Sequence, residues 1–125
     1  SREQAAELLR PKGFYQLFDE TCFQDYIKYA LTEDPRRGGV ELTISRDDEV
    51  KIFRTNSTLY WLLMPKPKVP TILVSGKDSP FIKQKLPQVI KKKLGIPYVV
   101  MQGGHMFPLE YPTETVELIK SLIQK

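Results

Sequence analysis

The chain has 125 residues, of which 41% are hydrophobic and 27% are charged, an ordinary composition for a soluble globular protein. No apolar run approaches the roughly 20 residues that span a bilayer, and the first residues lack the apolar centre of a secretory signal, so we expect no transmembrane segment and an intracellular, cytoplasmic location. The single cysteine, Cys22, excludes an internal disulfide framework, and the absence of a cysteine–histidine cluster argues against structural zinc.

The net charge of +4 owes much to the run Lys91–Lys93, which precedes Gly95 at a predicted helix end. Cations there complement the negative end of the helix dipole, so we interpret the run as a solvated helix terminus. A nucleic-acid surface would interleave basic residues with exposed aromatic residues along one face. The sequence has no such stripe, and nucleic acid is not a predicted partner.

The N-terminal region predicts small helices. Residues 2–10 form a short amphipathic pattern, and residues 21–31 form a second one that Asp19 or Thr21 can cap. Apolar side chains of the second helix recur at i, i+3, i+4 and i+7 and define one face, made of Phe23, Tyr26, Ile27 and Ala30.

A turn-rich break at 33–39 separates these helices from an extended segment at 40–44. Ser45 then opens another helix, because three acidic residues follow it in the first turn, and Thr55 begins its end. Residues 59–64 predict a further helical turn or a buried connector. The prolines of 64–70 require an extended entry into the next element.

Two short apolar runs, 71–74 and 98–101, are rich in branched residues and do not alternate with polar ones, which predicts buried parallel strands. The crossover between them is long enough for a helix. Because Pro87 cannot lie inside a regular helix, we expect a turn at 80–86 and a helix at 87–94 that buries Val89, Ile90 and Leu94.

A last helix is predicted from residue 112 to the end of the chain. Its apolar residues recur at helical spacing, while Glu114, Glu117 and Lys120 lie on the other side. We therefore expect one inner face, made of Val116, Ile119, Leu122 and Ile123.

Asp78 follows the first of the two strands, and His105, the only histidine, follows the second. Parallel neighbours end at the same edge of a sheet, which is where open α/β sheets place their ligands. We expect the two side chains to face each other across one crevice. An acid beside a histidine fixes its tautomer and lets the other ring nitrogen take a proton, so the pair favours acid–base chemistry.

These residues resemble parts of an α/β-hydrolase. The stretch 70–78 resembles the seventh strand and acid loop of that family, and 102–112 resembles its histidine loop. Residues 1–64 are similar to the helical cap inserted before that strand. The resemblance implies an α/β fold with two regions: a cap-like region at 1–64, and at 65–125 the C-terminal part of the core, a parallel βαβ unit with a closing helix.

The resemblance implies that His105 is a general base and Asp78 its orienting acid in the hydrolysis of a small-molecule ester or acyl bond, with no cofactor and no metal. A G-x-S-x-G elbow does not occur in the chain, so the serine would come from residues outside it, on an N-terminal hydrolase segment of the same precursor or on a separate chain. Met106, Phe107 and Trp61 are candidates to line the acyl site. The alternative is a non-catalytic binding or regulatory module with a degenerate hydrolase fold.

Overall fold

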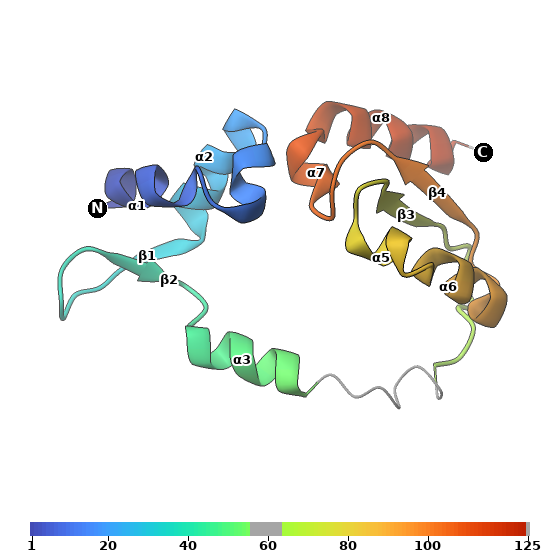
Figure 1. Cartoon of the computed structure of the whole chain (residues 1–125), viewed down its shortest axis with the longest axis horizontal. Coiled ribbons are helices and arrows are strands. Elements are labelled where there is room, and N and C mark those ends of the chain that lie inside the picture. The colour runs from blue at the N-terminus through green and yellow to red at the C-terminus, as the bar shows by residue number, and fades with distance from the viewer. Residues whose placement is uncertain (56–63, 125) are drawn as a thin grey trace. The chain divides into compact units, whose positions relative to one another are not determined.

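The computed structural model describes residues 1–55 and 64–124 as a mixed α/β chain with two small sheets (Figure 1). The chain divides into two compact units. Unit 1 comprises 1–16 and 23–64, and unit 2 comprises 17–22 and 65–125. Unit 2 therefore includes a short piece of the N-terminal region, and the roles assigned to 1–64 and 65–125 stay predictions.

Unit 1 begins with α1, Arg2–Leu9, which agrees with the helix predicted at 2–10. Ser1 and Gln4 cap it reciprocally, because the Gln4 amide donates to Ser1 Oγ at 3.4 Å and the Ser1 amine donates to Gln4 Oε1 at 2.8 Å. A 3-10 helix, Gly13–Leu17, follows.

The second helix, α2, spans Glu20–Tyr29. The predicted cap is confirmed, since Asp19 Oδ1 accepts hydrogen bonds from the amides of Thr21 and Cys22 at 2.9 and 3.3 Å. Phe23 and Ile27 are buried, as the periodicity predicts. These two side chains, with the first residue of the following strand, form the core of unit 1.

The prediction that α2 runs to residue 31 was wrong. The chain leaves the helix at Ala30, and Leu31–Glu33 form strand β1, which pairs antiparallel with β2, Val40–Leu42. Leu31 is 6% exposed in this strand. Its burial there outweighs the helical spacing that predicted a longer α2. Ser45 caps α3, Arg46–Arg54, by accepting the Asp48 amide at 3.1 Å, and Thr55 ends that helix, both as predicted.

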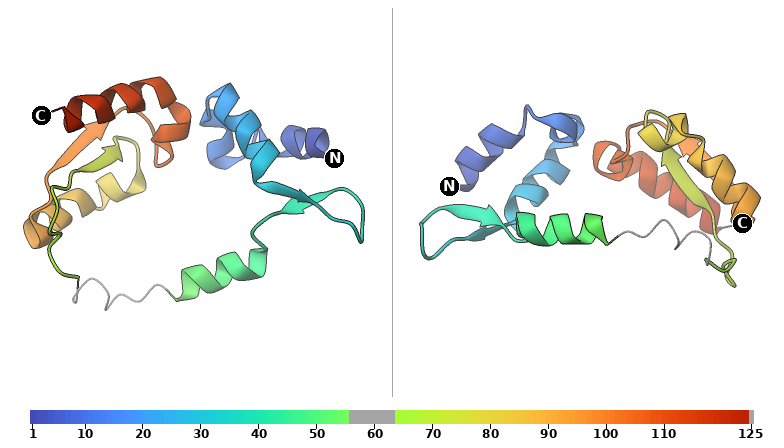
Figure 2. Two further views of the ribbon diagram at one scale, coloured as in Figure 1. Left: turned by 180° about the vertical axis from the view of Figure 1, so that it is seen from behind. Right: turned by 60° about the horizontal axis from the view of Figure 1, so that its bottom comes forward.

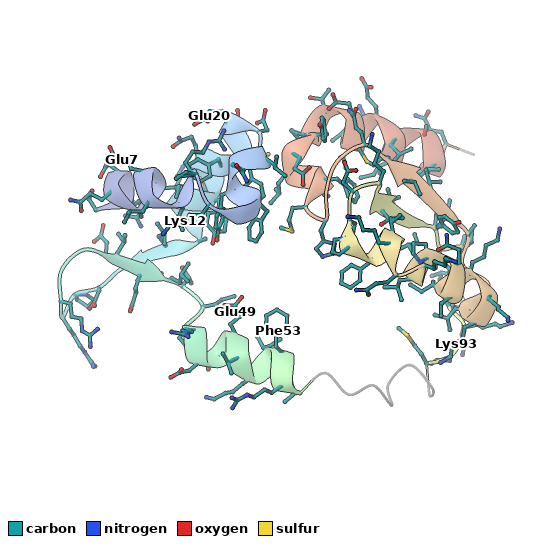
Figure 3. The ribbon with its side chains drawn as sticks, in the orientation of Figure 1. Glu7, Lys12, Glu20, Glu49, Phe53 and Lys93 are labelled. Atoms are coloured by element: carbon teal, nitrogen blue, oxygen red, sulfur yellow. The ribbon has the colours of Figure 1, made fainter. Side chains whose placement is uncertain are left out.

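None of the residues of α3 is buried. Its apolar residues Ile52 and Phe53 are 58% and 68% exposed, and Figure 3 shows Phe53 projecting from the helix. The connector predicted at 59–64 falls mostly outside the described residues.

Unit 2 is built on a parallel pair of strands, β3 at Leu73–Gly76 and β4 at Tyr98–Met101, which confirms the predicted pairing. The Leu73 amide donates to the Pro97 carbonyl at 2.9 Å and the Lys77 amide donates to Met101 at 2.8 Å. Leu73 and Lys77 thus face β4, and Val74 faces the other edge by alternation. Among the described residues, neither strand has a second neighbour.

The crossover contains α5, Pro80–Lys83, and α6, Leu86–Leu94, with the left-handed Lys85 between them at φ 57°. These helices lie on one side of the sheet, and α8, Pro112–Ile123, lies on the other, after the short α7, Phe107–Glu110 (Figures 1 and 2). The α8–sheet contact includes Thr115 Oγ1, which donates to Met101 Sδ at 3.8 Å.

Three burial predictions for unit 2 were wrong. The strands are only partly buried, since Val100 in β4 is 44% exposed. The sheet has only two strands among the described residues, so neither strand is covered on both edges. Val89 is 52% exposed, whereas Leu94 is buried as predicted. The predicted inner face of α8 is largely exposed, with Ile123 at 77%. No helix within 1–55 and 64–124 is both long and apolar enough to cross a bilayer.

Candidate functional site

The loop that follows β3 and the loop that follows β4 are joined at the carboxyl edge of the sheet. The Asp78 amide donates a hydrogen bond to the Gly103 carbonyl at 3.0 Å, immediately beyond the last pair of strand residues. The acid loop and the histidine loop therefore meet where the sequence places them.

Gly76 and Gly103 allow this approach. A Cβ on Gly76 would overlap the Gly104 carbonyl oxygen and come within 2.6 Å of the Gly103 oxygen, so only glycine lets the end of β3 pack against the histidine loop. Gly103 has φ +106°, a conformation that side chains disfavour, and a Cβ there would lie 2.9 Å from Phe107 Cβ.

Glu110 fixes the other side of the histidine loop. Its Oε2 accepts a hydrogen bond from the Gly104 amide at 2.7 Å, which is short, as expected for a charged acceptor. The carboxylate thus holds the residue next to His105 from the short helix α7.

The direct partner of the imidazole is Ser79. Its Oγ lies 3.3 Å from His105 Nδ1, and Ser79 is 1% exposed. Ser79 also caps α5, because its Oγ accepts the Phe81 amide at 3.4 Å and its own amide donates to Gly76 at 3.0 Å. The Phe81 ring contacts the imidazole edge-on, with 4.9 Å between centroids. The ring of His105 is therefore held by a hydroxyl and an aromatic side chain.

Asp78 and His105 lie in adjoining loops, but their side chains are not bonded to each other. Within the described part of the chain, the Asp78 carboxylate makes neither a hydrogen bond nor an ion pair. Both residues are exposed, so the carboxylate is solvated, and Ser79 occupies the contact at Nδ1 that the sequence assigned to Asp78.

A small cavity of about 140 Å³ adjoins the imidazole. Its walls come from β3, the crossover helices and the histidine loop, and include Leu73, Phe81, Ile90, His105 and Phe107. Apart from the imidazole and Ser75, the side chains in the wall are apolar, so this space suits a small apolar group placed next to the imidazole.

The three predicted substrate-binding residues have different positions. Phe107 lines the cavity beside His105. Met106 is half-buried in the same loop but is not part of that wall. Trp61 lies outside the described residues. No group of three or more histidine, cysteine or carboxylate side chains that could hold a metal occurs among the described residues.

Sequence reasoning missed the contact between Ser79 and His105. The Ser79-Pro80 pair signals a helix cap, and a capping serine gives no sign in the sequence that its oxygen also reaches a histidine 26 positions away. A search against protein-family models gave no match, and no curated protein or solved structure is significantly similar to the chain.

Proposed function

We propose that His105 is the general base of an α/β-hydrolase-type enzyme that cleaves an ester or related acyl bond. The observation that carries this proposal is the position of the imidazole: it lies at the carboxyl edge of a parallel strand pair, in the wall of an apolar cavity, with one ring nitrogen held by Ser79. The residues of this chain would orient the base and receive the apolar part of the substrate.

The contact at Nδ1 supports this role. When Nδ1–H donates to Ser79 Oγ, Nε2 carries the lone pair that takes a proton from a nucleophile. Nε2 makes no hydrogen bond within 1–55 and 64–124, so it is available to an incoming hydroxyl. The reverse arrangement, with the Ser79 hydroxyl donating to Nδ1, would place the proton on Nε2 and abolish the base.

Asp78 is the proposed acid that stabilises the imidazolium. Its backbone is hydrogen-bonded to the histidine loop at Gly103, and its carboxylate is exposed. In this proposal the carboxylate turns towards the ring when a substrate excludes water. Hydrogen bonds of catalytic groups are often loose before substrate binds.

The nucleophile in this proposal is a serine from a segment outside this chain. Ser79 is the serine that contacts His105, but at 1% exposure its Oγ is closed to substrate and already accepts the Phe81 amide. A buried capping hydroxyl positions the imidazole and does not attack a carbonyl.

The test is covalent labelling of the natural protein, purified from the cells that make it, with a fluorophosphonate probe. We expect a labelled serine and a labelling rate that falls by about a hundredfold or more in His105→Ala, the usual loss when a general base is removed. Lys83→Ala, an exposed change on α5, serves as the matched control and should label normally. A protein that is not labelled, or a His105→Ala variant labelled at the parent rate, contradicts the proposal.

The second candidate function is a non-catalytic binding module. It is favoured by the unbonded Asp78 carboxylate and by the exposed apolar residues of α8. This candidate predicts no labelling under any condition, together with a partner that protects Val116, Ile119 and Ile123 from solvent. Hydrogen exchange of α8 in the natural assembly measures that protection.

A further inference from the structure

Unit 2 has ten basic and six acidic residues, and most of its lysines are concentrated in one stretch of the chain. Between residues 64 and 109 the sequence has eight lysines, no arginine and one acidic residue, Asp78. All eight lysines are exposed. Unit 1, by contrast, has nine basic and nine acidic residues among its positions, so the net charge of +4 belongs to unit 2.

Five of these lysines are close in sequence to the residues that line an apolar cleft. The cleft lies at the end of unit 2 that is opposite His105, where the strands begin. The cleft has a volume of about 360 Å³ and lies between residues 67–72 and 94–97. Its wall contains no charged residue; its side chains are those of three prolines and of Thr71, Val69, Ile72, Leu94 and Ile96. Val69 is 69% exposed and Ile72 is 42% exposed, so this apolar surface is open to solvent.

The lysines lie next to the wall in the chain. Lys66 and Lys68 flank Pro67 in the first lining segment, and Lys91–Lys93 precede Leu94 in the second. Leu94 and Gly95 line the cleft, so the C-terminal end of α6 lies against it. One helix end carries roughly half a negative charge, so three lysines exceed what the dipole of α6 requires.

We propose that this cleft, with the lysines next to it in the chain, docks unit 2 on the surface of an anionic lipid membrane. The lysines would lie at the level of the anionic head groups, where each contributes to the attraction, and Val69 and Ile72 would enter the boundary with the acyl chains. The proposal does not depend on the chemistry of His105.

The composition of the surface favours a membrane over a nucleic acid. Nucleic-acid surfaces use arginine and exposed aromatic residues to reach phosphates and bases. This surface has lysines, which act as point charges, beside aliphatic side chains that are placed to leave water. Lysines beside exposed aliphatic residues match the surface of an anionic bilayer, where charged head groups lie above apolar acyl chains.

The experiment is sedimentation of the 125-residue chain with vesicles of phosphatidylcholine alone or with about one third phosphatidylglycerol. We expect binding to the anionic vesicles at least tenfold tighter than to the neutral ones, and a loss of that difference as salt is raised. The salt series uses the unaltered chain and so needs no variant to fold.

Two test variants and one control variant locate the surface. Lys91→Glu with Lys92→Glu should weaken binding to anionic vesicles at least tenfold, whereas Lys12→Glu with Lys28→Glu, the same charge change in unit 1, should have little effect. Val69→Ser should weaken binding while leaving its salt dependence unchanged. Circular dichroism checks that each variant is folded.

Three outcomes overturn the proposal. Equal binding to neutral and anionic vesicles removes the role of the lysines. An equal loss in the unit 1 control means that net charge alone is responsible. Complete displacement of the chain from anionic vesicles by single-stranded polyuridylate, with tighter binding to that polymer at the same salt concentration, identifies a nucleic-acid surface.

Discussion

The helices α2 and α8 both carry apolar residues at helical spacing, but only α2 buries the residues that the spacing selects. In α2, Phe23 and Ile27 are 2% and 5% exposed. In α8, Val116 and Ile119 are 49% and 46% exposed, and Thr115 is buried instead. The same pattern therefore gave a correct face in one helix and an incorrect face in the other.

The difference arises from what each helix has to pack against. The face of α2 meets Tyr15, whose ring lies 6.5 Å from that of Phe23, and the guanidinium of Arg10, 4.8 Å from the same ring. The face of α8 that meets the sheet is the one that carries Thr115, which donates to the Tyr111 carbonyl at 2.7 Å and reaches Met101. A two-stranded sheet covers only one part of a wide apolar arc, and the rest stays exposed.

Truncation of Phe23 should give the largest effect and tests this contrast directly. Phe23→Ala removes the most buried aromatic side chain among the described residues of unit 1, so we expect a loss of about 3–5 kcal/mol in the free energy of unfolding. Ile119→Ala in α8 is the matched change at an exposed position and should cost less than about 0.5 kcal/mol. Chemical denaturation followed by circular dichroism measures both, and similar costs would remove the distinction between the helices.

Gly76→Ala should give the next largest effect, because its Cβ would collide with backbone and not with a movable side chain. We expect a loss of about 1–3 kcal/mol and displacement of the histidine loop. The chemical shifts of the Gly104 amide and the His105 ring report that displacement. Ser75→Ala, one residue earlier in β3, is the control, and an undisturbed loop in Gly76→Ala would contradict the close packing.

Ser79→Ala and Ser45→Ala compare two helix caps, of which only one touches a histidine. Each substitution should cost about 1 kcal/mol, because each removes the oxygen that accepts a first-turn amide. Only Ser79→Ala should change the 15N shifts of the His105 ring, which report its tautomer. If the ring shifts are the same in both variants, Ser79 does not position the imidazole.

The smallest expected effect is a pH dependence in unit 1. Burial, together with the hydrogen bond between the Tyr26 and Tyr15 hydroxyls at 2.9 Å, raises the pKa of Tyr26 above its ordinary value. The unfolded chain then releases this proton first, so stability falls as pH rises above about 10, the ordinary pKa of tyrosine. Tyr26→Phe should lose less stability than the parent between pH 9 and 11, and an identical loss would contradict the assignment.

Local chemistry made much of the fold predictable. Ser45 and Asp19 mark helix starts because their side chains satisfy amides within three residues, and the parallel strands follow from branched residues and the length of the crossover. Leu31 was misassigned because its strand partner, Leu42, is 11 residues away and leaves no periodic signal.

The candidate site was predictable only at the level of its loops. The positions of Asp78 and His105 after two parallel strands implied that the loops meet, and the bond from Asp78 to Gly103 agrees. The contact of the imidazole with Ser79 depends on side-chain rotation and on a long-range approach that neither sequence spacing nor residue type encodes.

The turn after β3 also bears on how the chain behaves at high concentration. An unpaired strand edge is a template for growth by other molecules, and long exposed edges lead to fibrils. Here the edge is short, because the Gly76 carbonyl already accepts the Ser79 amide and the remaining edge-facing residue of β3 is Val74. The turn thus shortens the unpaired edge of β3, and Ser79→Pro, which removes that amide, would lengthen this edge by one residue.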